Sequence, residues 1–148
     1  MPRAVWGIGV AMLAALAACA EQEQALQSGD PNYAMVFFAT DSVTLSKRSQ
    51  DTLSMAVKEP TPPVRAVLQP ESKAKICVTG HSDNVGPDSI RMEVGQRRAD
   101  AVAKYLVGLG VPQQRMVITS VGGSKPLVVT SPGTPEISNR RVEVVFGC

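Results

Sequence analysis

The sequence GHSDNVGPDSIRMEVGQRRA, residues 80–99, joins a turn-rich loop to the start of a long helix. Two glycines and a proline within residues 80–87 favour a loop over regular structure. The apolar spacing that follows predicts a helix over residues 88–109, ended by a glycine and a proline. This places Asp83 on the loop and Arg98 on the helix, fifteen residues apart.

Arg98 falls on the apolar side of this predicted helix. At about 100° per residue it lies within a stripe of residues expected to face the core, namely Ile90, Val94, Ala101, Val102, Tyr105 and Leu109. An unpaired buried charge is very costly, so Arg98 needs a partner, and we expect Asp83 to be that partner. Two interpretations stay open: an internal salt bridge that orders the loop, or a pair that receives a zwitterionic ligand.

The opposite side of the same helix is expected to face water. Glu93 with Arg97, and Asp100 with Lys104, stand at the i, i+4 spacing at which opposite charges attract.

Shorter patterns predict the remaining elements. Strands are expected at residues 34–39, 76–79, 116–121 and 141–146, and a helix should begin after Ser46 and end at Pro60. The order β-α-β-α-β-β predicts a two-layer α+β domain. Four prolines make residues 58–75 a predicted surface loop. We favour a solvated insertion there over an added contact site for a partner.

Composition limits the classes of function. With 148 residues and 44% apolar content, the chain has room for one domain. Its formal charge of +2 is spread without a long basic run, which excludes a nucleic-acid surface.

The first residues predict export. Arg3 precedes an apolar run over residues 4–20, the layout of a secretory signal, and the run is slightly short for a membrane-spanning helix. Leu16-Ala17-Ala18-Cys19 resembles the lipobox of bacterial lipoproteins. We therefore expect a signal peptide at residues 1–18, a lipidated Cys19, and a flexible polar tether over residues 19–33.

Several motifs agree in order and spacing with one family. They are Gly80-His81-Ser82-Asp83, Arg98-Ala99, Tyr105-Leu106, Gly110, Arg115, Gly122, Pro126 and Asn139-Arg140-Arg141-Val142-Glu143. Together they resemble the OmpA-like C-terminal domain, the type found in peptidoglycan-associated lipoproteins and flagellar stator proteins. The resemblance implies that residues 34–148 form a four-stranded mixed sheet with helices packed on one face.

The resemblance also implies a function and its residues. The domain would bind peptidoglycan without covalent chemistry, through the diaminopimelate of the stem peptide. Asp83 would contact the ammonium and Arg98 the carboxylate, ideally as a bidentate fork, with Asp41 at the rim of the pocket. Arg91 departs from the family pattern, and would either add an anion contact or repel the ammonium. Arg140 is a weaker candidate for the site, and we favour a solvated or structural role for it.

The implied protein is a lipoprotein of the outer membrane that tethers this membrane to the wall, with its domain in the periplasm. The alternative is an assembly or scaffold lipoprotein of an envelope complex, with protein partners and only secondary wall binding. We expect no enzyme, cofactor or metal. His81, Ser82 and Asp83 are adjacent on one turn, where they cannot easily align as a hydrolytic triad.

Two cysteines remain once Cys19 is assigned to the lipid. In an oxidising periplasm they can pair, and the family fold places the second and last strands side by side. Cys77 and Cys148 are therefore a candidate disulfide.

Overall fold

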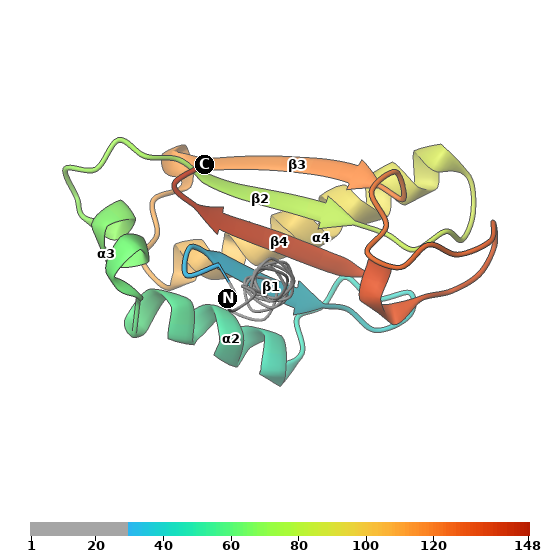
Figure 1. The fold of residues 1–148 in the computed structure, drawn as a ribbon, viewed down its shortest axis with the longest axis horizontal. Coiled ribbons are helices and arrows are strands. Elements are labelled where there is room, and N and C mark those ends of the chain that lie inside the picture. The colour runs from blue at the N-terminus through green and yellow to red at the C-terminus, as the bar shows by residue number, and fades with distance from the viewer. Residues whose placement is uncertain (1–29) are drawn as a thin grey trace, which may run out of the picture. The chain divides into compact units, whose positions relative to one another are not determined.

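Four strands form one mixed sheet in the computed structural model, which describes residues 30–148 (Figure 1). They are β1 (Tyr33–Phe37), β2 (Ile76–His81), β3 (Met116–Gly122) and β4 (Arg141–Phe146). The order across the sheet is β1-β4-β2-β3. β4 runs antiparallel to both of its neighbours, whereas β2 and β3 are parallel.

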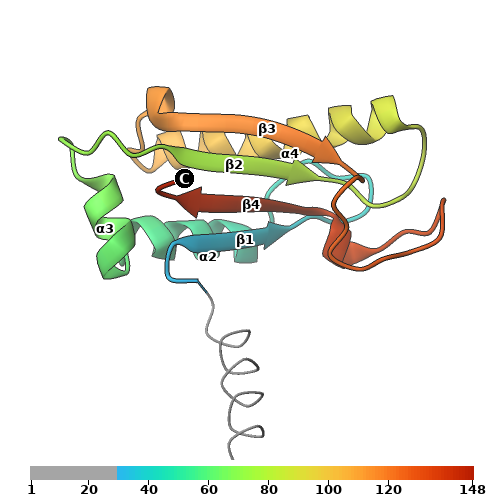
Figure 2. The ribbon, with the colours of Figure 1, turned by 45° about the horizontal axis from the view of Figure 1, so that its top comes forward.

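Two helices cover one face of this sheet. α2 (Lys47–Lys58) packs against β1, and α4 (Asp88–Gly108) packs against β2 and β3 (Figure 2). The predicted two-layer α+β architecture with a mixed four-stranded sheet is confirmed. Two short 3-10 helices, Gln113–Arg115 and Ile137–Asn139, precede β3 and β4. No helix within residues 30–148 is long and apolar enough to cross a bilayer.

The start of the chain needs separate mention. The predicted signal peptide at residues 1–18, Cys19, and the tether up to residue 29 lie outside the described residues. Pro31–Cys148 form one compact unit. The predicted tether boundary at residue 33 is three residues too late, because the compact unit begins at Pro31 and Tyr33 already pairs with Val145 of β4.

The core lies between the sheet and the helices, as the alternation in β4 predicts. Val142, Val144 and Phe146 are fully buried on the helix side of the sheet. Leu53 of α2 meets them from the second layer. The N-cap of α2 is the predicted one, since the Ser46 hydroxyl accepts a hydrogen bond from the Ser49 backbone N–H at 3.1 Å.

The loop predicted for residues 58–75 is partly wrong, because α3 (Pro62–Leu68) forms there. Two of the prolines occupy the first turn of this helix, where no backbone N–H is needed. Val64 is 2% exposed and belongs to the core. Arg115 then fixes the returning chain, donating to the backbone carbonyls of Val67, Gln69 and Ala74. The segment therefore closes one end of the core, which a solvated insertion would not do.

The core-facing side of α4 differs from the predicted stripe. Its buried residues are Gly95, Arg98, Ala99, Val102, Ala103 and Leu106. Burial of Arg98 and Val102 agrees with the prediction, whereas Ile90 is 49% exposed. The expected i, i+4 ion pairs are not formed: Asp100 accepts a hydrogen bond from Gln96 instead, and Arg97 makes no ion pair with any of residues 30–148.

A contact between two glycines explains why the helix turns its small residues inward. A Cβ added to Gly80 of β2 would lie 1.8 Å from the Gly95 backbone oxygen, and one added to Gly95 would lie 2.3 Å from the Ser120 hydroxyl oxygen. Backbone therefore packs directly on backbone where α4 crosses the sheet. The larger apolar side chains at the start of α4 therefore lie away from this crossing point.

We predict opposite effects of two alanine substitutions in α4. Gly95→Ala should lower the free energy of unfolding by about 1 to 3 kcal/mol, because its methyl group overpacks the crossing. Gly108→Ala has nothing within 4 Å of the added atom, and should stabilise by up to about 1 kcal/mol through helix propensity. Urea unfolding followed by circular dichroism measures both. Similar effects of the two substitutions would contradict the backbone contact.

Cys77 and Cys148 form a disulfide, with their Cα atoms 5.9 Å apart. Cys77 lies opposite Val145 in the β2–β4 ladder. Beyond β4 the chain turns at Gly147, and both Gly147 and Cys148 donate their backbone N–H to the Lys75 carbonyl. The bond therefore fastens the last residue of the chain to a central strand.

Loss of this disulfide should destabilise the domain. The bond spans a separation of 71 residues, and removing such a cross-link should lower the free energy of unfolding by about 2 to 4 kcal/mol. Urea unfolding with and without dithiothreitol measures the change, and the Cys77→Ser/Cys148→Ser double variant should not respond to the reductant. Titration of two reactive thiols in denatured, unreduced mature protein would contradict the pairing.

Candidate functional site

A charged cavity of about 540 Å³ lies beyond the ends of β1 and β2, beside the first turns of α4. Its walls come from the loop after β1, the loop after β2, α4, and the segment that leads into β4. The lining residues are Thr40, Asp41, Val43, Ser82, Asp83, Val85, Gly86, Ile90, Arg91, Val94, Arg97, Arg98, Gly133, Pro135 and Arg140. All five residues that the sequence proposed for the site, Asp41, Asp83, Arg91, Arg98 and Arg140, are among them.

Arg98 is held by backbone carbonyls. Its Nε donates to the Ser42 oxygen at 3.0 Å and its Nη1 to the His81 oxygen at 3.2 Å. The guanidinium carbon lies 5.4 Å from the centre of the Phe38 ring, which adds a cation–π contact. Burial lowers the pKa of Arg98, while the charges of Asp83 and Asp41 counteract this. The group stays charged, because arginine does not lose its proton in proteins.

Asp83 pairs with Arg140, so the prediction that it pairs with Arg98 is wrong. Arg140 Nη1 lies 2.9 Å from the Asp83 Oδ2 atom, and Arg140 Nε donates to the Phe38 carbonyl at 3.2 Å. The carbonyls of Ser42, in the loop after β1, and of His81, at the end of β2, already hold Arg98. Asp83 is therefore left to the guanidinium of Arg140, which immediately precedes β4. Asp83 and Arg98 therefore line one cavity without neutralising each other.

Asp41 stands at the rim in an unusual backbone conformation. Its φ is +52°, the left-handed region that few residues other than glycine adopt. Within residues 30–148 no other residue except glycine has a positive φ. The turn at Asp41 directs the next residue, Ser42, so that its carbonyl receives Arg98. Strained backbone of this kind often marks a functional site.

Arg91 is tied to its own surroundings. Its terminal nitrogens donate to the side chains of Asn84 and Asp88. The carboxylate of Asp88 offsets its charge. Arg91 also borders a second cavity, of about 560 Å³, which reaches Ser120 and Ser124.

Two further residues of the site were missed in the sequence. In the sequence Phe38 looks like an ordinary apolar residue of a strand, but it lies just after the last residue of β1 and provides both the ring beside Arg98 and the carbonyl for Arg140. Arg97 was assigned to an exposed ion pair, yet it lines the cavity. Its position beside Arg98 is the only signal that could have identified it.

The residues of the rejected triad do not form a hydrogen-bonded chain. The Ser82 hydroxyl donates to the Asp83 carbonyl at 3.2 Å, away from the imidazole. His81 is buried, and its Nε2 lies 3.5 Å from Glu143. Burial and the nearby Arg141 charge lower the pKa of His81. Within residues 30–148, no three His, Cys, Asp or Glu side chains group in a way that could hold a metal.

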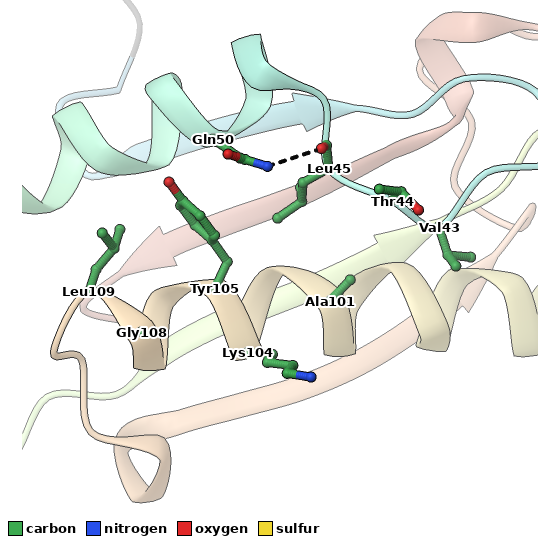
Figure 3. A pocket seen from close by; sticks show the side chains of 9 residues that line it. All are labelled: Val43, Thr44, Leu45, Gln50, Ala101, Lys104, Tyr105, Gly108 and Leu109. Carbon is green, nitrogen blue, oxygen red and sulfur yellow. Dashed lines mark hydrogen bonds between the residues drawn. The ribbon is translucent and has the colours of Figure 1, made fainter.

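A different hollow lies between α2 and α4 and is almost uncharged (Figure 3). Its volume is about 470 Å³, and Tyr105 reaches across it from α4 toward α2. Gln50 closes one end by donating to the Leu45 carbonyl at 3.3 Å. This hollow therefore has far fewer charged groups for a polar ligand than the Asp83–Arg98 cavity.

The sequence profile of the OmpA family matches residues 37–141, which include both Asp83 and Arg98. The chain belongs to the OmpA family. Within it, the peptidoglycan-associated lipoprotein of Rhizobium meliloti is 31% identical over 147 residues, covering 99% of this chain and 76% of that protein. The protein of the same name from Brucella melitensis is 32% identical over 111 residues, which cover 75% of this chain and 61% of the relative. The chain thus spans about three fifths of the Brucella protein.

Solved structures of OmpA-family domains share the fold. The peptidoglycan-associated lipoprotein from Burkholderia pseudomallei aligns with a TM-score of 0.63 at 26% identity, over 76% of this chain and 88% of that one. The C-terminal domain of Helicobacter pylori MotB aligns with a TM-score of 0.59 at 21% identity, over 74% of this chain and 79% of that one. At that identity, the second similarity concerns the fold alone.

We predict that the Asp83–Arg140 pair stabilises the site. Arg140→Met leaves a largely buried carboxylate and a carbonyl without their donor, and should lower the free energy of unfolding by about 2 to 4 kcal/mol. Adding Asp83→Asn should recover part of this loss, because the uncompensated charge is then gone. Lys47→Met breaks an exposed pair and should cause no measurable change. Additive effects of the first two substitutions would contradict the pairing.

Proposed function

We propose that this chain binds peptidoglycan non-covalently, by receiving the free ammonium and carboxylate of a diaminopimelate residue in the stem peptide. One observation carries the proposal: Asp83 and Arg98 line the same cavity, yet each is held by another part of the protein. An aspartate and an arginine fixed in this way offer opposite charges at a set separation. The free end of diaminopimelate, called the headgroup below, carries an ammonium and a carboxylate on one carbon and matches such a pair.

The roles follow from the remaining donors and acceptors. Asp83 shares one carboxylate oxygen with Arg140, so its other oxygen can accept from the ligand ammonium. Arg98 uses Nε and one Nη1 proton on carbonyls, which leaves N–H donors at both terminal nitrogens for the ligand carboxylate. Each contact is charge-assisted and should contribute about 1.5 to 3 kcal/mol. Lysine in place of diaminopimelate lacks the carboxylate and would lose the second contact.

Membrane attachment is part of the same proposal. Cys19 would carry acyl chains after removal of residues 1–18, and the polar residues up to Asn32 would join this anchor to the domain. The names of the Rhizobium and Brucella relatives, peptidoglycan-associated lipoproteins, support this arrangement. The chain would then connect the outer membrane to the wall from the periplasmic side.

We favour wall binding over the scaffold alternative as the main function of the chain, for a structural reason. The alternative assigns partner contact to residues 58–75 or to another face of the domain. Residues 58–75 are already used by the fold, because the apolar side chain of Val64 belongs to the core and Arg115 fastens the backbone that follows. Envelope proteins would then be additional partners of a chain already attached to the wall.

Intact sacculi with diaminopimelate-type stems test the proposal. The full chain, extracted in mild detergent, should sediment with these sacculi and not with lysine-type walls. Asp83→Asn and Arg98→Lys should each weaken retention about 10- to 100-fold. Asp100→Asn removes the same charge as Asp83→Asn from an exposed site on α4 outside the cavity, and should bind normally.

Thermal unfolding of each variant separates loss of binding from loss of fold. Folded Asp83→Asn and Arg98→Lys proteins that sediment as the unmodified protein does would overturn the pocket assignment.

A further inference from the structure

The cavity contains more positive than negative charge. Four arginines line it against two aspartates. Asp83 is paired with Arg140, and Arg91 is paired with Asp88 outside the cavity. Within residues 30–148, neither Arg97 nor Arg98 makes an ion pair. A headgroup with one ammonium and one carboxylate adds no net charge, so it leaves this excess in place.

Arg97 is the arginine best placed to bind a further anion. It lines the cavity from α4 immediately before Arg98, and its side chain is exposed at the mouth. Glu93, the i, i+4 neighbour that could have neutralised it, does not pair with it. Among residues 30–148 Arg97 makes no side-chain hydrogen bond either, so its donors are available to a ligand.

The volume of the cavity allows a larger ligand than one headgroup. At about 540 Å³, it lies within the roughly 300 to 1,000 Å³ of sites that hold whole small molecules. The headgroup contacts at Asp83 and Arg98 occupy the inner wall, since both side chains are largely buried, whereas Arg97 lies at the outer wall. A ligand that extends from the inner wall to the mouth would pass Arg97.

We infer that the ligand brings a second carboxylate, which Arg97 receives. This inference rests on the proposed function and names the form of wall peptide that the site selects. In a stem peptide, the residue joined to diaminopimelate is a γ-linked glutamate whose α-carboxylate is either free or amidated. The free form supplies the second anion, and the amidated form does not. Because Arg97 is exposed, its contact should change affinity by about two- to fivefold.

Isothermal titration calorimetry at low ionic strength tests this with two synthetic probes. One is L-alanyl-γ-D-glutamyl-meso-diaminopimelate, and the other is the same tripeptide with its glutamyl α-carboxylate amidated. The full chain in detergent should bind the free form about two- to fivefold more tightly. Arg97→Gln should abolish this preference by weakening binding of the free form alone. Added salt at 0.5 M should reduce the preference in the unmodified protein, because it screens an exposed pair.

A charge-matched control isolates the role of Arg97. Lys104→Gln removes one positive charge from the exposed side of the same helix without lining this cavity, and should keep the preference. Equal binding of both peptides by the unmodified protein, or a preference that survives Arg97→Gln, would overturn the inference while leaving the wall-binding proposal intact. If neither peptide bound to the unmodified protein, both the inference and the wall-binding proposal would be overturned.

Discussion

The close approach of α4 to the sheet at Gly80 and Gly95 sets the position of Arg98, on which the charged site depends. No side chain separates the two backbones there, so the helix lies as close to β2 as its own atoms allow. One turn later on α4, the same closeness brings the Arg98 side chain to the carbonyl at the end of β2. A methyl group at either glycine would move the helix outward, and Arg98 would lose a hydrogen bond that compensates for its burial.

Once buried, the Arg98 charge is stabilised without a dedicated carboxylate. Two carbonyl oxygens and an aromatic ring surround it, and together with the charges of Asp83 and Asp41 they offset its desolvation without a direct salt bridge. Asp83 is held by Arg140 in a similar way, from a different element. Each charge is thus fixed by the protein before a ligand arrives. Ligand binding then requires little rearrangement, and preorganisation of this kind limits the entropic cost of association.

Local signals in the sequence predicted the strands, the N-cap of α2 and the burial of Arg98, because apolar periodicity and capping residues act over a few positions. Pairing across the site could not be read in this way. Arg140 stands 57 residues beyond Asp83, and only the β4–β2 ladder brings the two together. The loop prediction for residues 58–75 missed α3 because it counted the prolines without regard to their position, and prolines are tolerated in the first turn of a helix. Glycine inside a helix usually costs about 1 kcal/mol, and the sequence alone does not show that Gly95 packs against Gly80.

The described chain enters at one end of β1, and the charged cavity lies beyond the other end of that strand. Under the proposed function, tension between membrane and wall would therefore run along the length of β1. The five residue pairs that join β1 to β4 would share this load in shear, because the force is parallel to the strands. Bonds loaded together resist more force than bonds peeled apart one by one, so the placement of the site suits a mechanical link.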